Sequence, residues 1–471
     1  MIKRTRFLTC ILAGCMAVTL SACNFMGGYN STSDLGSSLE ERPSTKYPTE
    51  VPNYDEYIQS RRIEHMAFIE PYPTEQNYQW LAESGMTGVI IGDDNIERNK
   101  ARLTLCDKYN ITAYIGFGRG TQILKSQIEE YFEYDSFKGL YTDEPLTMAQ
   151  LGIVFENNER LLGDKEGYEY VTTLICDKGE FETMEEYYDY YCSNMQGKTS
   201  QFWADIYPLK NLGYDSEIQQ DWLYALQVGA NAAKKYDMEM YQYISTMSIR
   251  SQNKRRPAYD DLMWTALVSL AYGAKGIGYF CYNSPGAPPY AGEFDSSNWA
   301  MVDMPDIYDT DGVTEDEWDK VERTETYYNV QKVISELNTF DHVLMSYDWE
   351  GTLVNYGKKA QTSSSQCFQF SSEVGYKIFV PMENHYRVKS MNSSEDMIVG
   401  TFVDENGYDG FLAVNFADPF YDLSNEIEIT FDDARSALVY TKAGSEIVKL
   451  TNGKFSMSLG SGDGCFIIPI G

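Results

Sequence analysis

The chain reads GLYTDEPLTMAQLGIVFENNERLLGDKEGYEYVTTLI over residues 139–175. Residues 139–142 and 170–175 are short runs rich in aromatic and β-branched side chains, as in strands that are buried on both faces. Between them, residues 147–162 place apolar side chains three and four positions apart, which predicts an amphipathic helix. This stretch therefore indicates a strand, a helix and a second strand, the βαβ unit of a parallel sheet.

The same unit recurs on both sides of this stretch. Apolar runs of β type start about every 30 residues, which is the period of a βα unit. They lie at 65–69, 88–91, 112–117, 139–142, 170–175, 202–206, 240–245 and 276–282. Helix-like segments follow at 74–84, 95–109, 121–133, 147–162, 184–194, 215–236 and 259–272, with a last helix at 315–337. Eight such units predict a (β/α)₈ TIM barrel.

An open, doubly wound parallel sheet is the alternative fold for this repeat. Such sheets bind ligands through a glycine-rich loop that opens a helix. Residues 116–120 (GFGRG) have the glycines but lack the G-x-G-x-x-G spacing. The barrel is therefore the expected fold, over residues 56–340.

The pattern changes after residue 343. Apolar and polar residues alternate in short segments, which turn sequences such as Asn406-Gly407 separate. This alternation is typical of antiparallel strands with one buried face. Residues 343–471 are expected to form a C-terminal all-β sandwich. The expected strands lie at 351–356, 366–370, 376–380, 396–403, 411–416, 426–431, 437–440 and 464–470.

The first residues resemble an export signal. Basic side chains among the first six residues precede an apolar run over 7–20, and a Ser-Ala-Cys sequence ends at Cys23. This run is shorter than the roughly 20 residues of a membrane span, and the cysteine resembles the bacterial lipoprotein box. We expect a signal peptide over 1–22, lipidation of Cys23 and a flexible tether over 23–55. Lipid on Cys23 would anchor the chain to the membrane on the extracytoplasmic side of a bacterial cell surface; an ordinary secretory signal is the alternative.

The composition limits the classes of function. With 70 acidic and 38 basic residues, the formal net charge is −32, which argues against a partner that is a nucleic acid. The chain has three histidines and no C-x-x-C pair, so we expect no metal site and no cofactor. Carboxylates are the side chains expected to carry any chemistry.

Two adjacent carboxylates stand where the fourth predicted strand ends. In (β/α)₈ enzymes the active site lies at the carboxyl ends of the strands, and Asp143-Glu144-Pro145 occupies such an end. Adjacent like charges raise the pKa of one carboxyl, which suits a general acid near neutral pH. The alternative is that Asp143 or Glu144 caps the helix that begins near Leu146.

This tip resembles the Asn-Glu-Pro sequence that ends strand four in clan A glycoside hydrolases. Residues 263–280, MWTALVSLAYGAKGIGYF, are similar to the approach to strand eight in β-galactosidase-like barrels and in exported glycosidase-like lipoproteins. The β domain is similar to the sandwich that those enzymes often carry. The resemblance covers residues 60–340, and it implies that Glu144 is the acid/base and that Asp143 hydrogen-bonds a sugar hydroxyl.

One position departs from that family. Clan A enzymes carry the nucleophilic Glu at the end of strand seven, where this chain has Gln242, and an amide cannot form the glycosyl-enzyme ester. Asp205, at the sixth tip, is the expected second carboxylate, whereas the Asp93-Asp94-Asn95 sequence after the second run is assigned to a helix cap. Inversion needs an acid and a base about 6.5–9.5 Å apart. We expect such a gap between Glu144 and Asp205.

Sugar binding needs flat apolar surfaces beside hydrogen-bonding groups. Arg119 and Gln242 are the expected donors to sugar hydroxyls. The expected aromatic surfaces lie at or after strand tips and are Trp203, Tyr207, Tyr241, Tyr243, Tyr282 and Trp299.

These observations predict a membrane-anchored, extracytoplasmic glycoside hydrolase that acts on an oligo- or polysaccharide by carboxylate acid/base chemistry. The alternative is a non-catalytic carbohydrate-binding lipoprotein, in which the barrel kept its cleft and lost its nucleophile. A purely structural surface protein is a third class, and it predicts no aromatic-lined cleft at the strand ends.

Overall fold

The computed structural model describes residues 47–54, 61–211, 215–219, 221–249, 253–284, 300–303, 315–358 and 381–471. The expected signal peptide, Cys23 and most of the expected tether lie outside these ranges. Within them, no helix is both long enough and apolar enough to span a bilayer.

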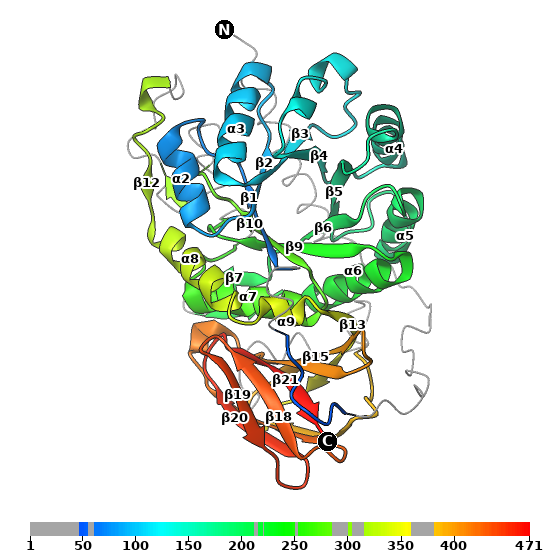
Figure 1. Cartoon of the computed structure of the whole chain (residues 1–471), viewed down its shortest axis with the longest axis vertical. Helices are drawn as coiled ribbons and strands as arrows, with labels where there is room; N and C mark the ends of the chain where they lie inside the picture. The colour runs from blue at the N-terminus through cyan, green and yellow to red at the C-terminus, as the bar shows by residue number, and fades with distance from the viewer. Residues whose placement is uncertain are drawn as a thin grey trace.

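Eight parallel strands close into a barrel, which confirms the predicted (β/α)₈ fold (Figure 1). Around the barrel the strands follow the order β1, β10, β9, β6, β5, β4, β3 and β2. Each strand end lies within two residues of the predicted run. The bounds are β1 Glu64–Phe68, β2 Gly88–Ile91, β3 Thr112–Phe117, β4 Phe137–Asp143, β5 Glu169–Ile175, β6 Gln201–Asp205, β9 Glu239–Ser245 and β10 Gly276–Phe280.

Helices surround the barrel and begin at polar caps. The side chains of Thr74, Asn95, Thr147 and Thr183 each accept a hydrogen bond from the backbone N–H three residues on, which satisfies a free donor of the first turn. The helices are α2 Glu75–Glu83, α3 Ile96–Tyr109, α4 Met148–Leu162, α5 Met184–Met195, α6 Trp222–Tyr236, α7 Tyr259–Ala271, α8 Glu325–Leu337 and α9 Asp341–Leu344.

The predicted helix over 121–133 is wrong. This segment forms only the short 3₁₀ turns η2 Lys125–Gln127 and η3 Tyr131–Glu133. Its backbone is held by side chains of α4 instead of by its own turns: Asn157 bonds the Thr121 carbonyl at 2.8 Å and the Ile123 N–H at 3.3 Å. These contacts compete with helix formation.

Two other predicted helices begin later than expected. Residues 216–218 form strand β8 Ser216–Ile218, which pairs with β7 Leu209–Asn211, so α6 starts only at Trp222. The last helix starts at Glu325 after a 3₁₀ turn, η5 Glu315–Glu317. A short antiparallel pair, β11 Val302–Asp303 and β12 Glu322–Arg323, precedes it.

Aromatic rings fill much of the barrel interior. The Trp203 ring centroid lies 4.9 Å from that of Tyr241 and 4.8 Å from that of Tyr243. On β10 the facing residues are glycines: a Cβ atom on Gly276 would lie 2.3 Å from the Tyr241 ring, and one on Gly278 2.4 Å from the Tyr243 ring. The two glycines therefore make room for the rings in a close-packed interior.

The C-terminal part forms two antiparallel sheets, which confirms the predicted sandwich. Residues of both sheets enclose one apolar core, including Leu353, Phe411, Ile429 and Phe455. The larger sheet contains β13 Tyr347–Asn355, β15 Met397–Asp404, β16 Asp409–Asn415, β21 Gly464–Ile470, β18 Ser436–Thr441 and β19 Gly444–Lys449, in that order. The smaller contains β14 Val388–Ser393, β17 Asn425–Phe431 and β20 Lys454–Leu459, and η6 Pro419–Tyr421 follows β16.

Two of the predicted strands, 366–370 and 376–380, lie outside the described residues, and β14, β19 and β20 were not predicted. The unpredicted strands expose much of their length and carry few apolar residues. Their alternation is therefore weak in the sequence.

The outer face of the larger sheet packs on the barrel (Figure 1). Helix α7 lies between the two and is buried on every side, which explains why it is apolar all round. Trp264 of α7 packs 5.0 Å from Trp222 and 5.2 Å from Phe416, measured between ring centroids. Arg255 joins the two parts by ion pairs to Asp261 at 2.6 Å and Asp418 at 2.8 Å.

Residues 47–54, which the sequence assigned to the tether, lie on the sandwich. The hydroxyls of Tyr54 and Tyr347 are hydrogen-bonded at 2.5 Å, and the Gly471 N–H donates to the Pro48 carbonyl at 3.2 Å. Arg387 stacks over the Tyr47 ring. The described part of the expected tether is therefore packed on the sandwich.

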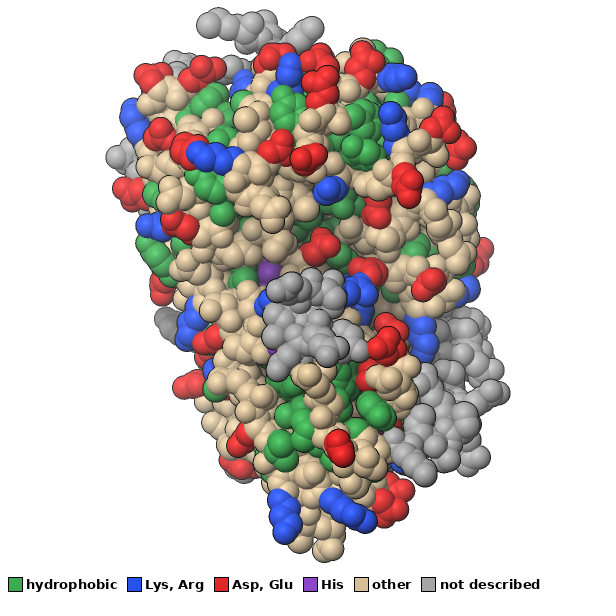
Figure 2. Space-filling view, viewed as in Figure 1, with side chains coloured by type: hydrophobic (Ala, Val, Ile, Leu, Met, Phe, Trp, Pro, Cys, Tyr) green, Lys and Arg blue, Asp and Glu red, His purple; other side chains and the backbone are tan. Residues whose placement is uncertain are grey.

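Acidic and basic side chains are interspersed over the face shown in Figure 2. The net charge of −32 is therefore not gathered into one patch on that face. The described cysteines other than partly exposed Cys176 are buried, and all five are free thiols.

Candidate active site

The Asp143-Glu144 pair lies at the carboxyl end of β4, and neither residue caps a helix. The cap of α4 is Thr147, which forms a capping box with Gln150. Glu144 has φ +42°, a left-handed conformation that is costly for a residue with a side chain. It is held there because its N–H donates to the Thr173 carbonyl at 3.0 Å. Helix capping therefore does not explain why two carboxylates stand at this strand end.

Glu144 contacts Arg119 and Asp205. Arg119, from the end of β3, forms an ion pair with the Glu144 carboxyl and donates from Nε to the Asp143 carbonyl at 3.0 Å. The Glu144 carboxyl also donates a hydrogen bond to the Asp205 carboxylate. Burial, followed by the charge of Asp205, raises the pKa of Glu144 to about 8, although the charge of Arg119 opposes the rise. Glu144 thus keeps its proton near neutral pH.

Asp143 points into the barrel beside three hydroxyl groups. Tyr141 donates to Asp143 Oδ1 at 3.0 Å, and the Tyr141 hydroxyl is also bonded to Thr173 and, at 3.4 Å, to Tyr243. Oδ2 of Asp143 is buried and has no hydrogen-bond partner among the described residues. Burial, followed by the charge of Glu144, raises the pKa of Asp143 to about 7.

Asp205 completes the cluster from the end of β6. Burial and the charge of Asp143 raise its pKa to about 7, while hydrogen bonds from Tyr207 and Glu144 lower it. Lys254 lies close by: Nζ donates to the Tyr207 carbonyl and, at 2.5 Å, to Gln219. Burial is the main cause that lowers the pKa of Lys254, to about 7.

The site contains more carboxyl groups than cationic groups. Arg119 is the cation that bonds directly to the cluster, which contains the three carboxyls of Asp143, Glu144 and Asp205. Burial and the repulsion between neighbouring carboxylates both disfavour the ionised forms, so the cluster retains protons at neutral pH. It can therefore donate a proton from Glu144 and accept one at a neighbouring carboxylate.

The expected gap between Glu144 and Asp205 is wrong. A hydrogen bond joins the two carboxyls, whereas a retaining pair is about 5–5.5 Å apart and an inverting pair about 6.5–9.5 Å apart. The tips of two strands that have one strand between them lie about 10 Å apart, but the positive φ of Glu144 swings its side chain toward β6.

The aromatic residues divide between the inside and the outside of the barrel. Trp203, Tyr207, Tyr241 and Tyr243 belong to the interior cluster and are at most 8% exposed, so they pack the barrel instead of forming an open platform. Tyr241 lies deeper than the carboxyl cluster, where it bonds Glu64 and Glu239. Trp299 lies outside the described residues.

Two predicted binding residues do not face the interior. Gln242 alternates with interior Tyr241 and Tyr243, and its side chain donates to the Tyr243 carbonyl at 2.8 Å. Tyr282 belongs to the outer cluster between strands and helices. The prediction that these two residues bind sugar is therefore corrected, because neither side chain reaches the carboxyl cluster.

Sequence reasoning missed Tyr141, Thr173 and Lys254. Tyr141 could have been found, because it lies two positions before Asp143 and thus on the same face of β4. Thr173 pairs with Asp143 in the strand register, which the sequence does not reveal. Lys254 reaches the site from the segment after β9, and no local pattern marks it.

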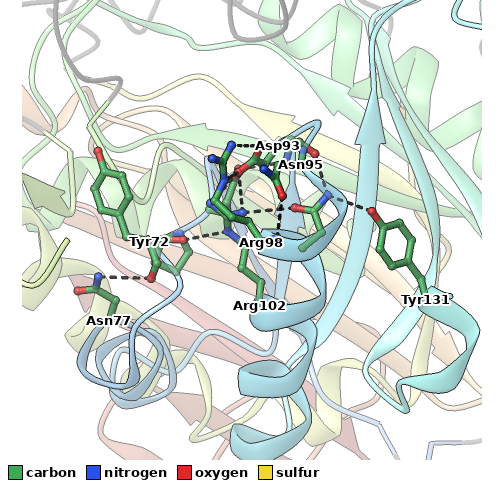
Figure 3. Close-up of polar contacts among 11 residues, drawn as sticks. Tyr72, Asn77, Asp93, Asn95, Arg98, Arg102 and Tyr131 are labelled. Atoms are coloured by element: carbon green, nitrogen blue, oxygen red, sulfur yellow. Dashed lines mark hydrogen bonds and ion pairs between the residues drawn. The ribbon is translucent and has the colours of Figure 1, made fainter. Parts of the chain in front are cut away.

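Other carboxylates at strand tips are tied into ion pairs (Figure 3). Asp93 binds Arg98 and Arg102, while Asn95 caps α3, as the sequence indicated. Glu70 accepts from the Gly92 N–H at 3.0 Å and lies 3.6 Å from Arg102. These contacts join the first two strand tips, so we assign them to structure.

One group in the sandwich has the spacing of metal ligands: Glu350, His385 and Asp409. Asp409 already accepts hydrogen bonds from Tyr386 at 2.6 Å and from Arg387 at 3.2 Å. Nδ1 of His385 accepts the Arg387 N–H at 3.2 Å, which leaves the ring proton on Nε2, the atom that faces Asp409. A metal-bound His normally donates its second ring N–H. These residues therefore fit a hydrogen-bonded network better than a metal site.

The fold and site define a (β/α)₈ barrel with a buried carboxyl cluster at the carboxyl ends of its strands. No family model matches the chain, and no curated protein matches it. Among solved structures, an Anoxybacillus α-amylase matches with 9% identity and a TM-score of 0.47, over 88% of this chain and 99% of that one.

Two further matches are named as enzymes of different classes, a glycosidase and an aldolase. A GH27 β-L-arabinopyranosidase from Geobacillus stearothermophilus matches with 8% identity and a TM-score of 0.46, over 88% of this chain and 98% of that one. An HpcH/HpaI aldolase from Desulfitobacterium hafniense matches with 6% identity and a TM-score of 0.33, over 48% of this chain and 89% of that one. Since one fold hosts many reactions, function has to be argued from the site.

Proposed function

We propose that the chain is a glycoside hydrolase in which Glu144 is the general acid. The observation that carries this proposal is the buried contact between the Glu144 and Asp205 carboxyls at the end of the barrel where such enzymes react, where burial raises the pKa of Glu144 and so favours its protonated form. Cleavage of a glycosidic bond needs a proton for the leaving oxygen, and an acid with a pKa near the working pH supplies it best.

The neighbouring residues assist the acid. Arg119 orients Glu144 and holds the β4 tip through the Asp143 carbonyl. Asp205 accepts the hydrogen bond of Glu144 and so keeps its proton in a fixed position. Partly exposed Asp205 and Arg119, whose side chain is 12% exposed, connect the buried cluster with the solvent.

The test is hydrolysis of a panel of plant and host oligosaccharides by the mature chain and by Glu144→Gln. The variant keeps the size of the side chain and removes its proton, so we expect turnover to fall by about 10²–10⁴. Glu97→Gln is the matched control, because that carboxylate is 80% exposed. Equal turnover by the wild type and Glu144→Gln would exclude Glu144 as the acid.

We also propose that the protein is a lipoprotein on the outer side of the cytoplasmic membrane, held by Cys23. The motif before Cys23 supports this location. Cells that express the wild type and Cys23→Ser are labelled with a radioactive fatty acid and fractionated. Label and membrane association in the wild type alone support the anchor; a soluble, unlabelled wild type contradicts it.

A non-catalytic carbohydrate-binding protein is the second candidate. The close contact of Glu144 and Asp205 favours it, since joined carboxyls do not bracket a bond. Glycan-array binding, followed by incubation with each bound sugar, separates the two functions. Binding without turnover of any bound sugar selects the second one.

A further inference from the structure

Three carboxylates near the strand tips, Asp205, Glu70 and Asp93, are not placed as an ordinary nucleophile for Glu144. A covalent intermediate needs a second carboxylate about 5–5.5 Å from the acid. Asp205 is in hydrogen-bond contact with Glu144 instead. Glu70 and Asp93 are engaged by Arg102 in the ion pairs described above.

The end of β9 does not supply a carboxylate either. Tyr241 and Tyr243 face the interior, and the described residues that follow are Ser245, Thr246 and Met247. Ser245 is turned back on its own loop, where its hydroxyl donates to the Met247 carbonyl at 2.7 Å. Among the described residues of these strand ends, no side chain is therefore placed to attack, which leaves water and the substrate as the candidates from this part of the structure.

Asp143 has a buried carboxyl oxygen that no described donor reaches. It is adjacent to the acid in the chain, it is 5% exposed, and Tyr141 fixes one of its oxygens. The other oxygen, Oδ2, lacks a hydrogen-bond partner among the described residues. A buried acceptor of this kind is costly unless a donor fills it in the working complex.

We propose that the substrate is a sugar with an acetamido group on C2, whose carbonyl oxygen is the nucleophile and whose N–H binds Asp143. An amide on C2 can reach C1 of its own ring, so it replaces an enzyme carboxylate. The same amide supplies the N–H donor that Asp143 Oδ2 lacks. This inference rests on the proposed glycosidase function and names its substrate class.

The reaction balances in two steps. First, Glu144 gives its proton to the glycosidic oxygen, the bond from C1 to that oxygen breaks, and the amide oxygen bonds to C1. Asp143 takes the amide proton as an oxazoline ring forms. Water then attacks C1 and gives a proton to Glu144, the ring opens, and Asp143 returns its proton to nitrogen. One water is consumed, and the anomeric configuration is retained.

The other groups around Asp143 fit this role. Tyr243 donates to Tyr141, and Tyr141 donates to Asp143, so the carboxylate is held in one orientation. A raised pKa, to about 7, makes Asp143 a base that can take a proton and return it at neutral pH. The two steps require Asp143 to take a proton in the first and to return it in the second.

The experiment compares 4-nitrophenyl 2-acetamido-2-deoxy-β-D-glucoside and -galactoside with the matching 2-hydroxy glycosides. We expect kcat/KM to be at least 100-fold higher for the acetamido substrates. Replacing acetamido by trifluoroacetamido weakens the attacking oxygen, so kcat should fall at least 10-fold. Asp143→Asn should lower kcat at least 100-fold on the acetamido substrates, whereas the exposed Asp135→Asn should leave it unchanged.

Binding of a thiazoline analogue of the oxazoline gives a readout that needs no turnover. Calorimetry should detect binding to the wild type and lose it in Asp143→Asn, with thermal unfolding used to confirm that the variant is folded. Glu144-dependent turnover that is as fast on the 2-hydroxy glycosides as on the acetamido glycosides, and is unchanged when acetamido is replaced by trifluoroacetamido, would overturn this inference and leave the proposed function standing. No turnover of any glycan and no thiazoline binding would overturn both.

Discussion

Glu144 and Asp205 come from strands that are separated by β5, yet a hydrogen bond joins their carboxyls. The positive φ of Glu144 and its N–H bond to Thr173 turn the side chain across the end of β5. In such a pair one carboxyl holds the proton and the other accepts its hydrogen bond. Burial raises the pKa of both carboxyls, so the pair holds a proton near neutral pH.

This pair predicts the pH dependence of turnover. The acid must be protonated and its partner ionised, so kcat/KM should peak between about pH 7 and 8 and fall on both sides. The two limbs belong to the coupled pair, not to single residues. A pH profile of the wild type measures them, and Asp205→Asn should shift the acidic limb, to which the ionisation of Asp143 also contributes. A profile that is flat from pH 6 to 9 would contradict the assignment.

The same carboxyls predict how stability depends on pH. Their pKa values are raised in the folded state, so the folded protein holds protons that the unfolded chain releases above about pH 4. Their contribution is complete below that pH and is lost as the pH rises through about 7 to 8. Urea unfolding at pH 5 and 9 should show the decrease, and it should be smaller in Asp143→Asn/Asp205→Asn. An equal decrease in both proteins would show that other groups cause it.

The barrel could be predicted because each strand is a separate apolar run between turn signals. The side of each strand that faces inward could not, since both faces of a barrel strand are buried. Gln242 shows the consequence: the sequence placed it in the site, but the register of β9 turns Tyr241 and Tyr243 inward. Glu144 shows the opposite case, because its positive φ breaks the alternation and brings it into the site.

Long-range contacts account for the rest of what the sequence missed. Lys254 is far in the chain from Glu144, and its approach to Asp205 depends on the loop after β9. The segment 121–133 has a helical pattern, but Asn157 and Arg160 of α4 bond its backbone. Such tertiary contacts override a local preference.

Lys254 is predicted to position the β6 tip. Lys254→Met would leave the Tyr207 carbonyl without its donor, which should lower the free energy of unfolding by about 1–3 kcal/mol. Loss of a positive charge near Asp205 should also move the acidic limb of the pH profile to higher pH. Lys235→Met is the control, since Lys235 is 56% exposed and should change stability by about 0.5 kcal/mol or less. An unchanged acidic limb in Lys254→Met would separate Lys254 from the site.

The glycines of β10 give the last prediction. A Cβ atom at position 278 would lie 2.4 Å from the Tyr243 ring and 2.6 Å from the Trp203 ring, and both rings are buried. Gly278→Ala should therefore lower the free energy of unfolding by about 1–3 kcal/mol. It should also lower turnover, because Tyr243 bonds Tyr141, which holds Asp143.

Gly152→Ala is the matched control for Gly278→Ala. Gly152 lies in α4, and no atom lies within 4 Å of the position that its Cβ would take. Alanine there should raise the free energy of unfolding by about 0.4–1 kcal/mol, because it restricts the unfolded chain and favours the helix. Urea denaturation of both variants measures the two changes. If both variants shifted the midpoint in the same direction, the clash with Tyr243 would not be what makes Gly278 necessary.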